Sequence, residues 1–114
     1  MNLGNYGEDI AVNYLVNKGY KVIERNFRCK MGEIDIVAGK DHILIFVEVK
    51  TRRGTVYGLP CEAVTSEKLE HIRRAAALYS LKNNLTEAQQ RIDVIEVLCR
   101  GEKAYIRHTE NVFC

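Results

Sequence analysis

The stretch from residue 32 to residue 53 constrains the fold more than any other part of this chain, because it predicts two strands of one hairpin. Residues 33–38 alternate with the period of a β-strand. The two predicted faces are Ile34, Ile36 and Ala38, and Glu33, Asp35 and Val37. Residues 43–51 are almost continuously apolar until Glu48, as expected of a strand buried on both faces. Residues 39–42 supply the turn.

Two acids and a lysine share one face of this predicted hairpin. A four-residue turn pairs Ala38 with Ile43, which places Asp35 opposite Phe46. Glu48 then lies one diagonal step from Asp35, at roughly 7 Å, and Lys50 follows on the same face. Two carboxylates at this spacing can share one hard divalent cation. A turn one residue longer or shorter would move the acids to opposite faces.

Charged residues in so apolar a strand have two interpretations, because an unpaired buried charge is costly. The simpler one is an ion pair between Lys50 and an acid at the end of an exposed hairpin. The other is a metal-dependent phosphodiesterase centre, in which Asp35 and Glu48 bind Mg²⁺ or Mn²⁺ and Lys50 positions the nucleophile or offsets developing charge.

Composition limits what such a centre could serve. The 114 residues, 46% of them hydrophobic, predict one compact domain over residues 1–114. A net charge of +2 permits nucleic-acid binding without demanding it. The four cysteines form no C-x-x-C pair, so we expect reduced thiols and no structural zinc. With no signal peptide and no transmembrane stretch, we expect a cytoplasmic protein without a membrane partner.

The remaining pattern predicts two helices and three further strands. Helices are expected at residues 5–18, ended by Gly19, and from Thr65 as N-cap to about residue 82. Strands are expected at residues 20–24 with an irregular continuation, at 91–98 and at 104–108, and a loop at 51–61. A strand-helix-strand crossover is right-handed and joins parallel strands. The order α-β-β-β-α-β-β therefore predicts an α/β fold with a mixed sheet flanked by helices.

Further charged residues are candidates for the site, each with a simpler alternative. Glu8 lies near the buried boundary of the first helix and could be an extra metal or water ligand, or only a first-turn acid favoured by the helix dipole. Five cations could contact phosphates, or could be solvated surface residues. They are Arg28 and Lys30 before the hairpin, Arg52 and Arg53 after it, and Lys68 in the second helix.

The histidines and the late acid Asp93 predict no site of their own. His42, His71 and His108 are scattered along the sequence, so we expect each in a turn or at the surface. Asp93 follows Arg91 by two residues, which favours a structural pair over a third metal ligand.

These residues carry a resemblance to known families. Asp35 followed by Glu48-Val49-Lys50, with Glu8 on a preceding helix, resembles the D…(E/D)-x-K core of the restriction-endonuclease-like nuclease superfamily, and the order is similar to archaeal Holliday-junction resolvases. G-E-D-I-A, R-N-F-R, G-E-I-D-I-V-A and F-V-E-V-K-T-R resemble, over nearly the whole chain, the YraN-like family of small bacterial proteins.

The resemblance implies a restriction-endonuclease-like fold and a function. Asp35 and Glu48 would be metal ligands, together with the backbone carbonyl of Val49, Lys50 the catalytic lysine and Glu8 the helix acid. The implied activity is Mg²⁺-dependent endonucleolytic cleavage of DNA, branched or otherwise structured, by a homodimer. Two alternatives stay open: a nucleic-acid-binding module of nuclease fold without independent catalysis, and an RNA-processing nuclease.

Overall fold

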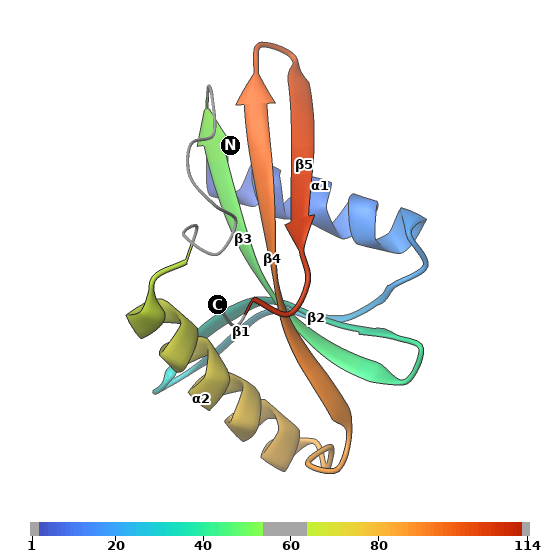
Figure 1. Ribbon diagram of the computed structural model, residues 1–114, viewed down its shortest axis with the longest axis vertical. Coiled ribbons are helices and arrows are strands. Elements are labelled where there is room, and N and C mark those ends of the chain that lie inside the picture. Colours follow the sequence, from blue (N-terminus) through green and yellow to red (C-terminus); the bar gives the residue numbers. More distant parts are fainter. Residues whose placement is uncertain (1–2, 54–63, 113–114) are drawn as a thin grey trace.

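The computed structural model describes residues 3–53 and 64–112. Two helices and five strands follow one another in the predicted order α-β-β-β-α-β-β, which is confirmed (Figure 1). The helices are α1 (Leu3–Asn17) and α2 (Ser66–Lys82), and the strands are β1 (Lys21–Cys29), β2 (Gly32–Lys40), β3 (Ile43–Arg53), β4 (Gln89–Arg100) and β5 (Lys103–Thr109). In this part of the chain no helix is long and apolar enough to cross a membrane.

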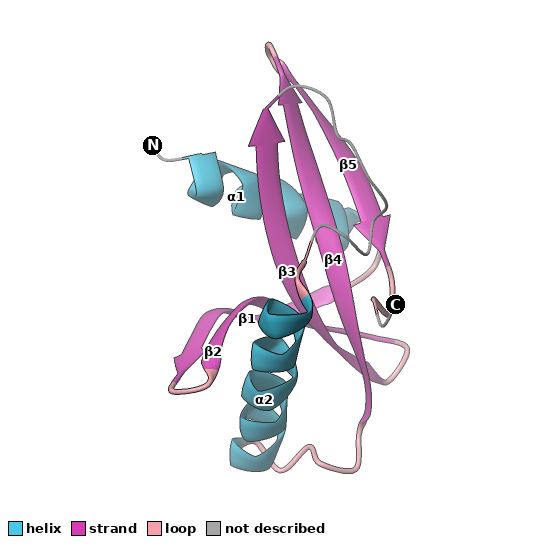
Figure 2. Ribbon diagram, turned by 60° about the vertical axis from the view of Figure 1, so that its left-hand side comes forward, coloured by secondary structure: helices cyan, strands magenta, loops and turns pink. Residues whose placement is uncertain are grey.

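The strands form one mixed sheet in the order β1-β2-β3-β4-β5. Consecutive strands pair antiparallel except β3 and β4, which run parallel because the chain between them crosses the sheet through α2. The predicted mixed sheet with one parallel pair is therefore confirmed. Figure 2 shows the long strands β3 and β4 running past both helices.

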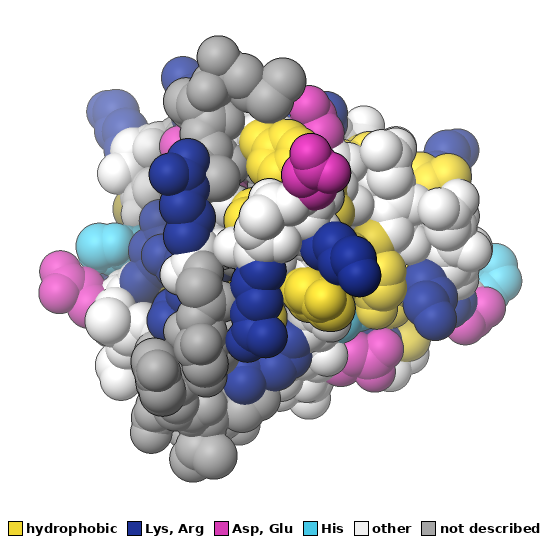
Figure 3. Space-filling view, turned by 90° about the horizontal axis from the view of Figure 1, so that it is seen from above, with side chains coloured by type: hydrophobic (Ala, Val, Ile, Leu, Met, Phe, Trp, Pro, Cys, Tyr) yellow, Lys and Arg dark blue, Asp and Glu magenta, His cyan; other side chains and the backbone are white. Residues whose placement is uncertain are grey.

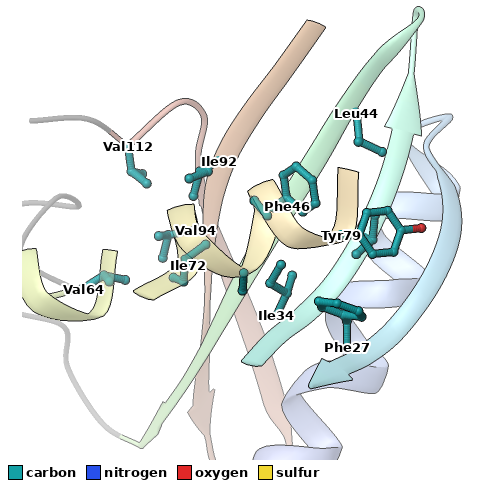
Figure 4. Close-up of a cluster of buried hydrophobic side chains, with 13 residues drawn as sticks. Phe27, Ile34, Leu44, Phe46, Val64, Ile72, Tyr79, Ile92, Val94 and Val112 are labelled. Carbon is teal, nitrogen blue, oxygen red and sulfur yellow. The ribbon is translucent and has the colours of Figure 1, made fainter. Parts of the chain in front are cut away.

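Helix α2 covers one face of the sheet. Its N-cap is Thr65, whose hydroxyl accepts a hydrogen bond from the Lys68 amide at 3.1 Å. Its apolar stripe packs on β2, β3 and β4, where Phe46 and Tyr79 meet edge to face at 5.8 Å between ring centroids (Figure 4). The buried residues of α2 are Ile72, Ala75, Ala76, Tyr79 and Ser80.

Helix α1 covers the opposite face. Gly7, Ala11 and Leu15 form its buried stripe, and Ala11 and Leu15 are fully buried. Gly19, with a φ of 91°, ends the helix as the sequence predicts. The core on this side combines α1 with alternate residues of the central strands: Ile36, Ala38, Ile45, Val47, Ile95 and Val97. The sheet is therefore buried on both faces, which explains the nearly continuous apolar run of β3.

The hairpin of β2 and β3 has a shorter turn than the sequence predicts. Lys40 pairs with Ile43, so only Asp41 and His42 form the turn, both with positive φ (52° and 65°), as a type I′ turn requires. Phe46 consequently pairs with Val37 instead of Asp35. Because the error is two residues, the predicted faces of β3 keep their parity.

The predicted loop at residues 51–61 is wrong at its start. Strand β3 continues through Thr51 and Arg52 to Arg53, paired with β4. The rest of that loop, and the cysteines at 61 and 114, lie outside the described residues. Cys29 and Cys99 are free thiols.

Candidate functional site

Asp35 and Glu48 lie at the point where β2 and β3 stop pairing. The last pair of the ladder is Ile36 with Val47, so the next residues outward along the two strands are Asp35 and Glu48. The Val49 amide donates a hydrogen bond of 2.8 Å to Asp35 Oδ2. The carboxylate of Asp35 thus takes the place of a ladder bond, and the register puts Asp35 opposite Glu48 instead of one diagonal step away.

The backbone of β2 is irregular at Asp35, which corrects the predicted alternation. Ile34 packs with Val37 on the α2 face, whereas Ile36 lies on the α1 face. The β1–β2 ladder skips the position of Asp35, and the residue facing it, Asn26, has a positive φ of 55°. Such irregularities re-aim a side chain and are common beside functional sites. Period-two reasoning cannot detect them.

Glu48 is a buried acid with unequal surroundings for its two oxygens. Its side chain is 6% exposed, and Lys50 Nζ and Lys68 Nζ lie 3.8 and 3.9 Å from Oε1. The other oxygen, Oε2, is buried and has no hydrogen-bond partner among the described residues. Burial, and then the negative charge of Asp35, raise the pKa of Glu48 to about 7 against the opposing effect of the two lysines. Burial also raises the pKa of Asp35, although the Val49 amide opposes it.

The two lysines reach this acid from different elements. Lys50 follows Glu48 by two residues on the same face of β3, as the sequence predicts. Lys68 lies in the first turn of α2, which Thr65 caps. Both side chains are more than a third exposed, so they line the open side of the carboxylate pair. The structure brings together Asp35, Glu48, Lys50 and Lys68.

Glu8 approaches the pair from α1 but has its own partners. Arg25 Nη2 lies 3.8 Å from Glu8 Oε1. With its amide oriented to satisfy both acids, Asn26 donates hydrogen bonds of 3.2 Å to Glu8 and to Glu33. Burial and then the charge of Asp35 raise the pKa of Glu8. Within residues 3–53 and 64–112, no three His, Cys, Asp or Glu side chains form a ready cluster for a metal ion. Glu8 is therefore a neighbour of the pair, linked to it through charge.

The other predicted phosphate contacts lie outside this group. Arg28 is 77% exposed and 3.7 Å from Glu33 on β2, and Lys30 is exposed in the turn between β1 and β2. Arg52 and Arg53 are the last residues of β3, on opposite faces of the sheet. By this alternation Arg52 shares the face of Glu48 and Lys50.

A second polar cluster, which the sequence did not predict as a whole, lies on the α1 face. Asp93 is fully buried and accepts two hydrogen bonds from Arg91, at 2.8 and 2.9 Å, so the predicted pair is confirmed. His108 Nε2 lies 2.8 Å from Asp93, and Tyr14 OH lies 3.0 Å from His108 Nδ1. Although burial opposes it, the bonds from His108 and Arg91 lower the pKa of Asp93. The prediction of a surface position for His108 is wrong, since its side chain is only 8% exposed.

One signal in the sequence could have found this cluster. Asp93 alternates with Ile95 and Val97 on a face that is buried, and a buried acid needs partners. Arg91 lies on the same strand, but His108 and Tyr14 come from β5 and α1, which only the fold brings together.

The chain is similar to many bacterial proteins over nearly its whole length. Residues 7–97 match the family described as "Uncharacterised protein family UPF0102". A UPF0102 protein of Syntrophotalea carbinolica is 48% identical over 113 residues, 99% of this chain and 92% of that protein. UPF0102 proteins of Clostridioides difficile and Alkaliphilus metalliredigens are 46% and 47% identical, over 96% and 98% of this chain and 95% and 97% of their own. The chain therefore belongs to the UPF0102 family.

Proposed function

We propose that this protein is a divalent-metal-dependent endonuclease that hydrolyses phosphodiester bonds in DNA, with branched or structured DNA as its substrate, in the cytoplasm. The observation that carries this proposal is Oε2 of Glu48, which is buried beside the carboxylate of Asp35 and has no hydrogen-bond partner within residues 3–53 and 64–112. Two acids with raised pKa values and one orphaned oxygen make an unfavourable arrangement on their own. A hard divalent cation, which prefers oxygen ligands, would compensate it.

The residues present fit such a cation. Asp35 and Glu48 would supply one carboxylate each. The carbonyl of Val49 would supply a third oxygen, because the N–H and C=O of one residue in an extended strand point to the same neighbour, and the Val49 amide already points to Asp35. Glu8 would act from further out, since Asn26 and Arg25 hold its carboxylate. We expect Mg²⁺ or Mn²⁺.

The lysines would do the rest of the chemistry. Bound Mg²⁺ would polarise the phosphoryl oxygens and lower the pKa of a nearby water. Lys50, at the open side of Glu48, would donate hydrogen bonds that orient the attacking water and would offset the charge that develops on the phosphate. Lys68 would hold a non-bridging phosphate oxygen from the side of α2.

The order of these residues supports the same proposal. Asp35, then Glu48-Val49-Lys50 in the middle of a central strand, with a helix glutamate before them, is similar to the core of restriction-endonuclease-like nucleases and of resolvases. Resolvase-like proteins pair to cut two strands, so we propose a homodimer as the acting form. The alternatives are a binding module without independent catalysis and a nuclease that processes RNA.

The test is cleavage of labelled linear, flapped and four-way-junction DNA, and of RNA of the same sequence, with Mg²⁺ or Mn²⁺. Wild type should cut DNA, whereas Glu48→Gln and Lys50→Met should each lower the rate by at least about a hundredfold. Glu70→Gln, which changes an exposed acid of α2, is the matched control and should cut normally.

Other outcomes separate the alternatives. Binding of DNA without cleavage in either metal would favour the binding module. Preferential cleavage of the RNA would favour the RNA-processing nuclease. Equal cleavage by wild type and Glu48→Gln would reject the proposed site.

A further inference from the structure

The sheet face that carries Glu48 and Lys50 continues across β4 and β5 beyond the part that α2 covers (Figure 1). Directly paired residues of neighbouring strands point to the same face. Lys50 pairs with Glu96, and Glu96 pairs with Arg107. The next row outward is Arg52, Leu98 and Tyr105, and the last pair is Arg100 with Lys103. We call the residues Leu98, Arg100, Lys103, Tyr105 and Arg107 the β4–β5 surface.

On this face the acidic side chains are buried and the basic side chains reach solvent. Its strand acids are buried, since the side chains of Glu48 and Glu96 are 6% and 0% exposed. Its cations reach solvent: Lys50, Arg52, Arg100, Lys103 and Arg107. A chain with a net charge of only +2 therefore presents a basic face next to the candidate site. Figure 3, which looks onto the upper ends of these strands, shows Lys and Arg side chains gathered there.

Arg107 is oriented for an anionic ligand. Its Nε and Nη2 donate to the two carboxylate oxygens of Glu96 at 2.9 and 2.8 Å. These two bonds use two of the five N–H donors of the guanidinium. Three donors remain, and the side chain as a whole is 33% exposed. Arg107 lies two strand spacings, roughly 10 Å, from Lys50, within reach of the same nucleic-acid strand.

Tyr105 adds an aromatic ring to the cations. It is 48% exposed, and the Arg100 guanidinium carbon lies 5.7 Å from the centre of its ring. An exposed ring among cations is the arrangement by which proteins bind single strands, because unpaired bases stack on the ring while cations contact the backbone. Bases inside a duplex are already stacked and cannot use such a ring.

We propose that the β4–β5 surface binds unpaired nucleotides of a DNA strand whose phosphodiester bond lies at the Asp35–Glu48 site. Tyr105 stacks on a base, and Lys103 and Arg107 contact phosphates. The inference rests on the proposed nuclease function and narrows its substrate to DNA with a single-stranded arm. Binding itself needs no turnover, so it can be measured separately.

The experiment measures fluorescence anisotropy of labelled DNA with the whole protein in EDTA, where no metal-dependent cleavage occurs. The probes are a single strand, a blunt duplex of the same sequence and the same strand as RNA. Tyr105→Ala should weaken single-strand binding about tenfold and duplex binding less than about twofold. Tyr105→Phe should bind like wild type, because the ring is kept. Lys103→Ala should reduce the slope of log affinity against log salt by about one.

Tyr6→Ala is the matched control, since Tyr6 is 37% exposed on α1, away from this face. Unchanged single-strand affinity in Tyr105→Ala, equal losses for single strand and duplex, or tighter binding of RNA than of DNA would each overturn the proposal. If wild type cuts no DNA but single-strand binding depends on Tyr105, the surface is supported and the nuclease function fails. If wild type cuts DNA and Tyr105→Ala binds and cuts as well as wild type, the nuclease function is supported and the proposed role of the β4–β5 surface fails.

Discussion

The burial of Glu48 lowers the stability of the fold at the proposed metal site. Lys50 and Lys68 each lie almost 4 Å from one of its oxygens, too far for hydrogen bonds, and the other oxygen has no partner in the described part of the chain. A packed apolar side chain would be more favourable there for stability alone. A residue that keeps this cost fits a binding role better than a structural ion pair, the simpler interpretation that the sequence left open.

The raised pKa of Glu48 predicts how stability depends on pH. The folded protein holds this proton up to about pH 7, whereas the unfolded chain releases it near 4.5. Because the folded state binds the proton more tightly, the free energy of unfolding falls as pH rises through this window, by on the order of 3 kcal/mol without divalent metal. Glu48→Gln should remove this fall and be more stable than wild type above about pH 7. Urea unfolding across the window measures both.

The matched control for that experiment is Glu96→Gln. Glu96 is also buried, but it accepts two short hydrogen bonds from Arg107. Its substitution should lower stability, because it breaks a buried pair. If wild type gained stability between about pH 5 and pH 8, or if Glu48→Gln lost stability as Glu96→Gln does, the unfavourable arrangement at Glu48 would be disproved.

The elements of the fold were largely predictable, because most segments are locally consistent. The apolar periods predict both helices, Gly19 predicts where the first one ends, and Thr65 predicts where the second one begins. The strand-helix-strand order then predicts the parallel strand pair. The errors in the hairpin and in its pairing with β1 fall where the backbone has positive φ, at Asp41, His42 and Asn26. At these positions a non-glycine residue adopts a conformation that its identity only weakly predicts. The sequence therefore predicted that Asp35, Glu48 and Lys50 lie together, but not the irregular strand that brings Asp35 level with Glu48.

The packing of α1 on β3 gives a prediction at the scale of elements. A Cβ at Gly7 would collide with Thr51 Oγ1 and lie 2.9 and 3.0 Å from Thr51 Cβ and Cγ2. Gly7→Ala should push α1 away from the sheet and lower the free energy of unfolding by about 1–3 kcal/mol. Adding Thr51→Ala should restore part of the loss, because it removes the closest atom. Chemical denaturation of the single and double variants measures this coupling.

Gly39→Ala is the control for Gly7→Ala. A Cβ at Gly39 would meet Ile23 Cδ1 at 3.5 Å, an ordinary contact. Its cost should therefore be smaller than that of Gly7→Ala. Simple additivity of Gly7→Ala and Thr51→Ala would show that the two residues do not limit the approach of the helix.

At the scale of the whole molecule, the two faces of the sheet divide their tasks. The α1 face buries the Asp93 cluster, in which Arg91, His108 and the Asn111 amide partner the acid. The α2 face carries Glu48, whose Oε2 has no hydrogen-bond partner among the described residues, together with exposed cations. Local spacing predicted the pair of Arg91 and Asp93, but His108 and Arg107, which partner Asp93 and Glu96, lie on β5 and could not be found from local patterns.

This division predicts that a divalent cation stabilises the whole fold through one pair of acids. A cation that binds only the folded state raises the free energy of unfolding by about 2.7 kcal/mol at a hundredfold excess over its Kd. Protons compete for Glu48, so the rise in melting temperature with Mn²⁺ or Mg²⁺ should be larger at about pH 8 than at about pH 6. Thermal melts should show this rise in wild type and in Glu70→Gln, and lose it in Asp35→Asn and Glu48→Gln. A rise of the same size in Glu48→Gln, or one independent of pH, would place cation binding elsewhere on the molecule and leave Glu48 without a ligand that explains its burial.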